Sequence, residues 1–289
     1  MDNDYSFEFN ELDKQTNVVL LLVNNPNLKM DSPYNYEICG MKMMDYVKHC
    51  FKYANIIEKE INAGEDVLDA VKTVSLADRK YTMILFSDTP LLKRKTVLEV
   101  LEYMQMKKLS VLKLTRGYVF ETDYLKTIDK LYAPQLHYFD EEDFMACVNL
   151  KQLSIITEIL QNRIISYHQQ NGVIFTNPNT CKIDIDCNIG CGTKIENNNV
   201  LKGKVIIGNN SHLQSNNVIE NSVIKNNVTI TCSNITNAFI EEDCVIRPYC
   251  VIKNNSYLEK GVVVNEFSYV SGSLIKQNAV IEAFSKLKN

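Results

Sequence analysis

Residues 183–201, IDIDCNIGCGTKIENNNVL, carry an aliphatic side chain at every sixth position, beginning with Ile183. Steps of five or six residues continue this series, so that the chain holds eighteen aliphatic anchors, namely Ile183, Ile189, Ile195, Leu201, Ile207, Leu213, Ile219, Ile224, Ile230, Ile235, Ile240, Ile246, Ile252, Leu258, Val264, Val270, Ile275 and Ile281. Neither an α-helix nor an alternating strand has this period. It is typical of hexapeptide repeats in a parallel β-helix. With three short strands per triangular coil, we predict a left-handed β-helix of about six coils.

The residues between the anchors support the same prediction. The fourth residue after an anchor is mostly small or β-branched, as at Cys187, Thr193, Val205, Ser211, Val223, Val228, Cys244, Cys250, Ser256, Val262, Ser268 and Ala279. Asparagine is concentrated here, with 21 of the chain's 32 falling after Gln170. Pairs such as Asn209-Asn210 and Asn226-Asn227 suit coil corners because asparagine tolerates left-handed backbone angles.

Six cysteines in this region invite a different interpretation, a metal site. They are Cys181, Cys187, Cys191, Cys232, Cys244 and Cys250, and they form no Cys-x-x-Cys pair. The six-residue gap from Cys244 to Cys250 is the repeat period. We therefore interpret them as buried structural thiols, since free cysteine behaves as a small hydrophobic residue.

The first half of the chain alternates predicted strands with predicted helices. We expect strands at residues 17–23, 81–86, 110–114 and 117–120, and helices at residues 41–53, 65–74, 96–106 and 123–132. This alternation predicts a parallel sheet covered by helices on both faces, an α/β domain of Rossmann-like type. Apolar residues at helical spacing then predict a linker helix, with Leu153, Ile156, Leu160, Ile164 and Tyr167 on its buried stripe. The predicted domains are thus residues 1–148, the linker 149–170 and the β-helix 171–289.

Composition excludes several classes of partner. The 289 residues include 31 basic and 35 acidic side chains, a net charge of −4, and no basic cluster, so we expect no nucleic-acid partner. No apolar run approaches the roughly 20 residues that cross a bilayer, and we expect no membrane association. The first 16 residues are acidic, unlike a signal peptide, which predicts a cytoplasmic protein.

Four short motifs make the chain resemble a known family. They are VIENSVI at residues 218–224, IRPY at 246–249, and the segments 148–154 and 171–173 around the linker helix. Together with the domain order, they resemble the bifunctional N-acetylglucosamine-1-phosphate uridyltransferase/glucosamine-1-phosphate acetyltransferase family over residues 17–283. The resemblance implies a reduced, divergent sugar-nucleotidyltransferase-like domain, a sugar phosphate or nucleotide sugar as ligand, and a homotrimer assembled through the β-helix.

The resemblance also implies where the uridyltransferase chemistry would lie. Lys29 matches the family's phosphate-facing arginine, and Asp88 and Asn149 match the two residues that hold Mg²⁺. The alternative is that Asp88 and Asn149 only cap a turn and a helix. The loop departs from the family pattern, since Asn25 and Asn27 replace its glycines. Two further departures are Pro26, which lacks an N–H donor, and Tyr34, which stands at the position of the family's catalytic lysine.

The acetyltransferase site departs further from the family. The family's general-base histidine would fall near Ala283, and no histidine follows His212. The sugar-binding segment of the first domain is also missing, because only 28 residues separate Asp88 from Arg116. We therefore assign no catalytic residue and exclude acetyl transfer by this mechanism.

Three functional hypotheses remain. We favour a relative that lacks acetyltransferase activity, lacks or is impaired in uridyltransferase activity, and has a regulatory or sugar-nucleotide-binding role. The second is an active Mg²⁺-dependent sugar-1-phosphate nucleotidyltransferase of altered specificity, and the third is a structural trimerisation module. Whether the chain is an enzyme is left open by its sequence.

Overall fold

The structure is a computed structural model that describes residues 7–29, 32–131 and 139–288, with side chains from residue 11 onward. The chain divides into two compact units, Met1–Ile159 and Leu160–Asn289. The division falls within the long helix α6 (Leu150–Gln170), which coincides with the predicted linker helix. Each unit has its own core and is described by itself below.

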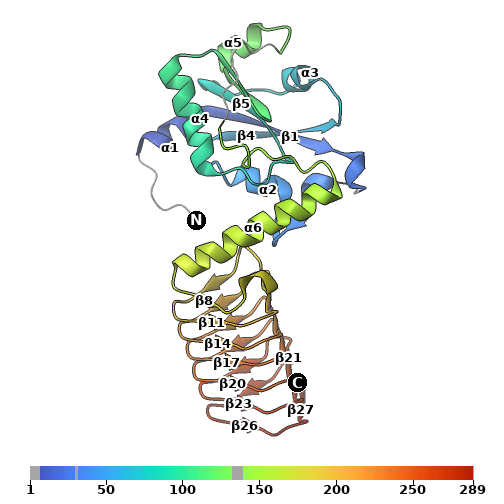
Figure 1. Cartoon of the computed structure of the whole chain (residues 1–289), viewed down its shortest axis with the longest axis vertical. Helices are drawn as coiled ribbons and strands as arrows, with labels where there is room; N and C mark the ends of the chain where they lie inside the picture. Colours follow the sequence, from blue (N-terminus) through green and yellow to red (C-terminus); the bar gives the residue numbers. More distant parts are fainter. Residues whose placement is uncertain (1–6, 30–31, 132–138, 289) are drawn as a thin grey trace. The chain divides into compact units, whose positions relative to one another are not determined.

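The first unit is built on a five-stranded sheet (Figure 1). The strand order across it is β4 (Asn55–Asn62), β1 (Thr16–Asn24), β5 (Tyr81–Phe86), β7 (Gly117–Glu121) and β6 (Val111–Leu114). β1 and β5 are parallel, as predicted, and the unpredicted β4 is parallel to β1. β7 is antiparallel to both of its neighbours. The prediction of a parallel sheet therefore needs one correction. The two-residue connection Thr115-Arg116 is too short for a parallel crossover and produces a β-hairpin.

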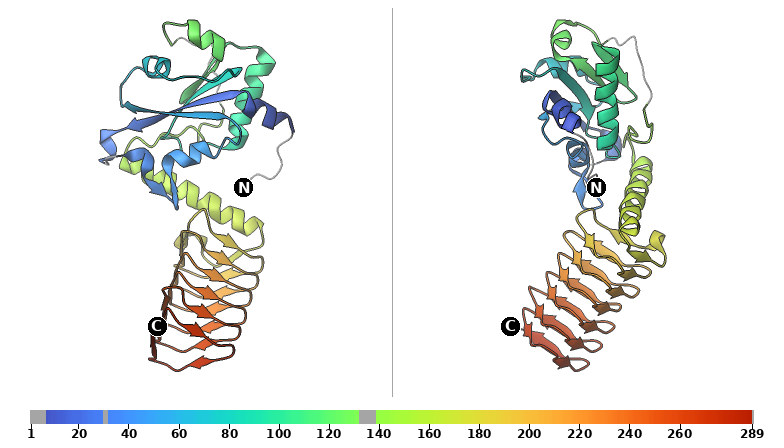
Figure 2. Two further views of the ribbon diagram at one scale, coloured as in Figure 1. Left: turned by 180° about the vertical axis from the view of Figure 1, so that it is seen from behind. Right: turned by 90° about the vertical axis from the view of Figure 1, so that its left-hand side faces the viewer.

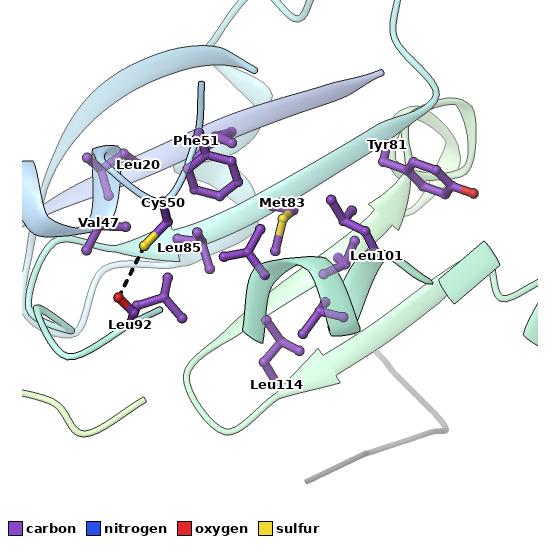
Figure 3. Packing of buried hydrophobic residues seen from close by; sticks show 14 of the residues in the cluster. Leu20, Val47, Cys50, Phe51, Tyr81, Met83, Leu85, Leu92, Leu101 and Leu114 are labelled. Atoms are coloured by element: carbon purple, nitrogen blue, oxygen red, sulfur yellow. Dashed lines mark hydrogen bonds between the residues drawn. The ribbon is translucent and has the colours of Figure 1, made fainter. Parts of the chain in front are cut away.

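Both faces of this sheet are covered, as the strand–helix alternation predicts. Along β1 the side chains alternate, with Val18, Leu20 and Leu22 packing into one apolar cluster and their neighbours into the other. The first cluster includes residues of α2 (Met43–Lys48) and α4 (Arg94–Lys107), and the second includes residues of α3 (Val67–Lys72) and α5 (Thr122–Thr127). Figure 3 shows the first cluster, where the Cys50 thiol donates to the Leu92 carbonyl at 3.2 Å.

Several element boundaries differ from the sequence prediction. The predicted helix at residues 41–53 is only α2, and that at 123–132 is α5, with residue 132 outside the described residues. Strand β4 is missed because it lies at the sheet edge, where its charged, half-exposed residues lack an apolar alternation. The remaining elements of this unit are α1 (Phe7–Lys14), η1 (Pro26–Leu28), η2 (Pro33–Asn35), β2 (Glu37–Ile38) and β3 (Met41–Lys42).

Helix α6 buries most of its predicted stripe. Ile156, Leu160 and Ile164 are buried, whereas Tyr167 is 40% exposed and His168 is buried in its place. Burial lowers the pKa of His168. In the second unit, the Gln161 amide pairs with the backbone of Ile183, donating to its carbonyl at 3.1 Å and accepting its N–H at 3.2 Å. This pair links the helix to the first coil.

The second unit is the predicted left-handed parallel β-helix, whose stacked strands are visible in Figures 1 and 2. One side has six strands, β10 (Asn188–Ile189), β13 (Ile206–Ile207), β16 (Val223–Ile224), β19 (Phe239–Ile240), β22 (Tyr257–Leu258) and β25 (Leu274–Ile275). The second has seven, β8 (Ile174–Phe175), β11 (Lys194–Ile195), β14 (His212–Leu213), β17 (Thr229–Ile230), β20 (Val245–Ile246), β23 (Val263–Val264) and β26 (Val280–Ile281). The third also has seven, β9 (Lys182–Ile183), β12 (Val200–Lys202), β15 (Val218–Glu220), β18 (Asn234–Thr236), β21 (Val251–Lys253), β24 (Tyr269–Ser271) and β27 (Lys286–Lys288). A short 3₁₀ turn, η3 (Pro178–Thr180), lies before the first complete coil.

The predicted anchors form the core of this β-helix. All eighteen lie on strands, and seventeen are buried, the exception being the half-buried Ile281. Each anchor pairs with the anchor three strands later, so that Leu201 pairs with Ile219 and Ile219 pairs with Ile235. The sequence prediction of the repeat and its register is confirmed.

The small-residue position needs a correction where the repeat shortens. Val223 is half-buried on β16, and Ser222 is buried instead, with its hydroxyl accepting the Ala238 N–H at 3.1 Å. The small buried residue therefore lies at a constant position, two residues before the next anchor. At the same position Asn217 donates to the Asn199 side-chain oxygen at 2.9 Å inside the coil. The predicted corner residues Asn210 and Asn227 adopt left-handed angles, with φ of 55° and 58°.

Among the described residues, no helix is both long and apolar enough to cross a membrane. No group of three or more His, Cys, Asp or Glu residues among them could hold a metal ion. Burial raises the pKa of the Cys187 thiol to about 12 and that of Cys244 to about 11. These two cysteines are therefore buried, protonated thiols, as the repeat predicts.

Candidate functional site

The candidate site lies where strands β1 and β5 end. From β1 the chain leads to β4 on one side of it, and from β5 it leads through α4 to β6 and β7 on the other. Open α/β sheets bind ligands at the carboxyl ends of strands where the connections diverge in this way. We call the residues gathered here the sheet-edge site, defined as Asn25, Lys29, Asp88, Arg116 and Asn149.

The loop after β1 folds into the 3₁₀ turn η1, and its backbone donors are used within the loop. The Asn27 N–H donates to the Asn25 side-chain oxygen at 3.0 Å. The N–H groups of Leu28 and Lys29 donate to the carbonyls of Asn25 at 3.2 Å and Pro26 at 3.1 Å. Pro26 has no N–H. A loop that cradles phosphate needs such donors pointing outward, and here the donors of residues 26–29 point inward or do not exist.

The Asn25 side chain also ties this loop to a distant segment. Its amide nitrogen donates to the carbonyl of Val148 at 3.1 Å, 123 residues away in sequence. Asn25 is buried, and its side chain fills the space that a glycine would leave open. Lys29 follows with a left-handed φ of 52° and an exposed side chain. Among the described residues Lys29 has no ion-pair partner, and it is exposed to solvent.

Asp88 lies directly after β5 and forms a buried ion pair. The residue as a whole is 5% exposed. Arg116 binds it in bidentate fashion, with Nε donating to Oδ1 at 2.7 Å and a terminal nitrogen donating to Oδ2. The guanidinium lies 4.3 Å from the centroid of the Phe86 ring, which adds a cation–π contact. Burial raises the pKa of the Asp88 carboxyl, while the Arg116 charge acts in the opposite direction.

Hairpin geometry explains why Arg116 reaches Asp88. Arg116 occupies the two-residue connection between β6 and β7, and β7 pairs with β5. The next residue, Gly117, has φ of 134°, and a Cβ there would lie 2.5 Å from the carbonyl oxygen of Ile84. Only glycine allows the hairpin to approach β5 this closely. The hairpin tip therefore projects Arg116 over the end of β5.

Asn149 acts as the N-cap of α6. Its side-chain oxygen accepts the N–H of Gln152 at 3.0 Å, and the Gln152 side chain in turn accepts the N–H of Val148 at 3.2 Å. This exchange resembles a capping box, which stabilises the start of a helix. The segment also approaches Asp88, because the Cys147 N–H donates to the Asp88 carbonyl at 2.7 Å. The structure thus brings Asn25, Asp88 and Asn149 to one edge of the sheet.

As arranged, these residues do not fit a magnesium ion. Mg²⁺ prefers oxygen ligands in a near-octahedral shell. Both carboxylate oxygens of Asp88 already accept hydrogen bonds from a guanidinium, and the Asn149 oxygen caps a helix. Cys147 contributes no ligand, since burial and the Asp88 charge raise the pKa of its thiol to about 12. The positive charge that contacts Asp88 belongs to Arg116.

Sequence reasoning missed the role of Arg116. In the sequence this residue marks only the end of a shortened segment, whereas in the structure it is the partner of Asp88. A usable signal exists in the two residues that separate the predicted strands at 110–114 and 117–120, because so short a connection implies a hairpin tip. The sequence does not say which loop that tip approaches.

His212, the last histidine of the chain, and Lys253 lie on different strands of the β-helix. His212 contacts Glu196, with Nε2 and Oε1 2.9 Å apart, on strand β14. Lys253 lies on β21 with its ammonium group 5.2 Å from the Tyr269 ring. The coil that would carry the histidine has Ala283 at this position, which is an exposed residue.

Comparison with known proteins identifies the relatives of this chain. The family described as bacterial transferase hexapeptide (six repeats) matches residues 186–221. The bifunctional protein GlmU of Lactobacillus johnsonii is 32% identical over 169 residues, which are 57% of this chain and 36% of that protein. The bifunctional protein GlmU of Streptococcus agalactiae is 34% identical over 149 residues, 52% of this chain and 32% of its own length. The alignments thus cover about a third of each relative.

Proposed function

This chain is a GlmU-like protein with hexapeptide repeats, and from that premise we propose that it binds a sugar phosphate or nucleotide sugar without uridyltransferase or acetyltransferase activity. Its role is then regulatory rather than catalytic. The observation that carries this proposal is the closed loop after β1, whose N–H groups at Asn27, Leu28 and Lys29 all donate within the loop.

Nucleotidyl transfer depends on backbone N–H groups that face the phosphates, and the loop after β1 does not provide them. The chemistry needs little covalent assistance and relies on positioning and neutralising the phosphates. Outward-facing N–H groups and a divalent cation usually provide both. The inward donors of the loop and the pairing of Asp88 with Arg116 support the loss of this chemistry. The neighbouring Cys147 thiol is no substitute base, since burial and the Asp88 charge raise its pKa to about 12.

Two cationic groups support a remaining capacity to bind an anion. Lys29 is exposed in the loop after β1, and the Arg116 side chain is 29% exposed. Charged donors of this kind form the stronger hydrogen bonds to phosphate oxygens. We therefore assign ligand binding to Lys29, assisted by the accessible part of Arg116, without a catalytic step.

The test combines an activity assay with a binding assay. Purified protein is incubated with Mg²⁺, UTP and N-acetylglucosamine 1-phosphate, and pyrophosphate is measured. We expect no release, and a rise in melting temperature with UDP-N-acetylglucosamine that is reduced in Lys29→Ala. Lys42→Ala, which changes another exposed lysine of the same unit, is the matched control and should retain the full shift. Pyrophosphate release that disappears in Asp88→Ala would instead establish the alternative, an active nucleotidyltransferase.

A specific surface feature favours assembly as a second function. On the six-stranded side of the β-helix, five successive outward residues are apolar, and we call them the outer stripe, namely Ile206, Val223, Phe239, Tyr257 and Leu274. Its end residues Ile206 and Leu274 are 40% and 51% exposed. The Phe239 and Tyr257 rings are stacked with centroids 4.9 Å apart. Contiguous exposed apolar surface of this kind marks interaction sites.

We propose that the outer stripe is buried between copies of the chain in a homotrimer. Light scattering should give three times the 33.1 kDa chain mass. The double variant Ile206→Lys/Leu274→Lys should reduce this to a monomer, because it places two charges in an apolar contact. Asn234→Lys, on an exposed position of a different side, is the control and should leave the trimer intact. A wild-type mass equal to one chain would contradict the proposal.

The thiols of the chain support a proposal about its compartment. Seven cysteines of the described residues are free thiols, namely Cys147, Cys181, Cys187, Cys191, Cys232, Cys244 and Cys250. Free cysteines in this number are typical of a reducing environment. We therefore propose a cytoplasmic location.

A further inference from the structure

The guanidinium of Arg116 lies at the buried carboxylate of the sheet-edge site. The Asp88 side chain is 7% exposed, and Arg116 contacts both of its oxygens. A buried carboxylate is stable only when it is paired or neutralised. The carboxyl end of a central strand faces the usual ligand crevice, so the pairing charge can come from a metal ion or from a cationic side chain. Here it comes from Arg116.

The setting of Arg116 is suited to a permanent counter-ion. Its planar fork matches the two oxygens of a carboxylate, and it stays charged at any pH that proteins tolerate. One face of the guanidinium lies against Phe86, and the backbone position is set by the hairpin and by Gly117. Three neighbours thus hold the guanidinium in one orientation. Each Asp88 oxygen therefore already accepts a hydrogen bond from a fixed cation.

We infer that Arg116 replaces a divalent cation at the sheet-edge site, so that this site is metal-independent and removal of Arg116 opens Asp88 to metal. The inference rests on the proposed function, because it explains how the site remains charged without Mg²⁺. A freed Asp88 would offer one carboxylate, with waters completing the shell, which is a common arrangement for weakly held Mg²⁺ or Mn²⁺. Removal of the Arg116 guanidinium should therefore create a metal site, and this gain is the consequence that can be tested.

The test measures metal binding directly with Mn²⁺, whose free form gives an electron paramagnetic resonance signal that is lost on binding. Wild-type protein should show no saturable binding at millimolar Mn²⁺. Arg116→Ala should bind one Mn²⁺ and should melt at a higher temperature in its presence. The matched control Arg116→Ala/Asp88→Asn keeps the shape of the site but lacks the charge, and it should bind none. Arg116→Gln, which retains a hydrogen-bond donor and more of the side chain, repeats the test should Arg116→Ala fail to fold.

Two results would overturn the inference. One is saturable Mn²⁺ binding by wild-type protein that is lost in Asp88→Asn, since a metal would then displace Arg116. The other is a folded Arg116→Ala or Arg116→Gln protein that binds no Mn²⁺. Neither depends on turnover. Pyrophosphate release by the wild type would contradict the proposed function instead, and the two failures are therefore distinguishable.

Discussion

Ile230→Ala is expected to lower the free energy of unfolding of the β-helix by about 2–5 kcal/mol. Ile230 is fully buried on β17, and it stacks between Leu213 on β14 and Ile246 on β20. Truncation removes three methyl or methylene groups and leaves a cavity on the coil axis. The stacked strands are short and hydrogen-bonded to both neighbours, so the surrounding coils have little freedom to close it.

The adjacent residue provides a matched control. Thr229 precedes Ile230 on the same strand, but its side chain points outward and is half-buried. Thr229→Ala should change stability by less than about 0.5 kcal/mol. The unfolding of the β-helix in urea is followed by circular dichroism for wild type and both variants, and the midpoint urea concentrations are compared. Equal losses in the two variants would mean that the inward anchors do not dominate the stability of this unit.

The contrast between Ile230 and Thr229 shows why the β-helix was predictable from sequence. Each anchor repeats one physical requirement, an aliphatic side chain pointing at the axis, and the requirement recurs at nearly constant spacing. A single residue carries little information, but eighteen in register specify the strands, the coil number and the pairing partners. The one misplaced position, Val223, falls where a five-residue step shifts the small side chain to Ser222.

The α/β unit was predictable only in part, because its contacts are not periodic. Strand β5 was predicted with its observed ends, since Tyr81–Phe86 is a continuous apolar run in the middle of the sheet. Strand β4 lies at the edge and has a weaker pattern. The direction of β7 depends on a connection of two residues. Local pattern identifies buried elements well, whereas edges and hairpins depend on tertiary pairing.

The candidate site illustrates the same limit more sharply. Asp88 and Asn149 were chosen by resemblance, and the structure does place their segments together through the Cys147–Asp88 hydrogen bond. The partner of Asp88 is Arg116, which lies 28 residues away at the tip of the β6–β7 hairpin. The Asn25–Val148 hydrogen bond spans 123 residues. Side-chain contacts at such separations follow from the assembled sheet, and no motif in one sequence encodes them.

Arg116→Ala should destabilise the first unit by about 3 kcal/mol at neutral pH, because it leaves the Asp88 carboxylate buried without its partner. We choose the lower end of the range for a broken buried pair since Arg116 is itself 29% exposed. The effect should exceed that of Asp88→Ala, in which the remaining guanidinium can turn toward solvent. The two single variants therefore differ in which charge stays buried.

The loss of stability in Arg116→Ala should also depend on pH. The direction of this dependence distinguishes the loss of the charge pair from the loss of packing. Burial already raises the pKa of Asp88 in the folded protein, and removing Arg116 takes away the opposing effect. Between the unfolded pKa, about 3.9, and the higher folded pKa, the folded state binds more protons than the unfolded state. Stability therefore falls as pH rises through this window, and the loss is complete above the folded pKa.

Urea denaturation of wild type and Arg116→Ala at about pH 5 and about pH 8 tests this sign. The difference between the two proteins should be larger at the higher pH. The Arg116→Ala/Asp88→Asn variant carries no ionisable group at this position. Its free energy of unfolding relative to wild type should therefore not show the pH dependence that Asp88 causes in Arg116→Ala. If Arg116→Ala lost the same stability at both pH values, packing against Phe86 rather than the charge of Asp88 would account for the role of Arg116. A guanidinium that serves as a counter-ion must show the first pattern, because its contribution exists only while the carboxyl that it faces is ionised.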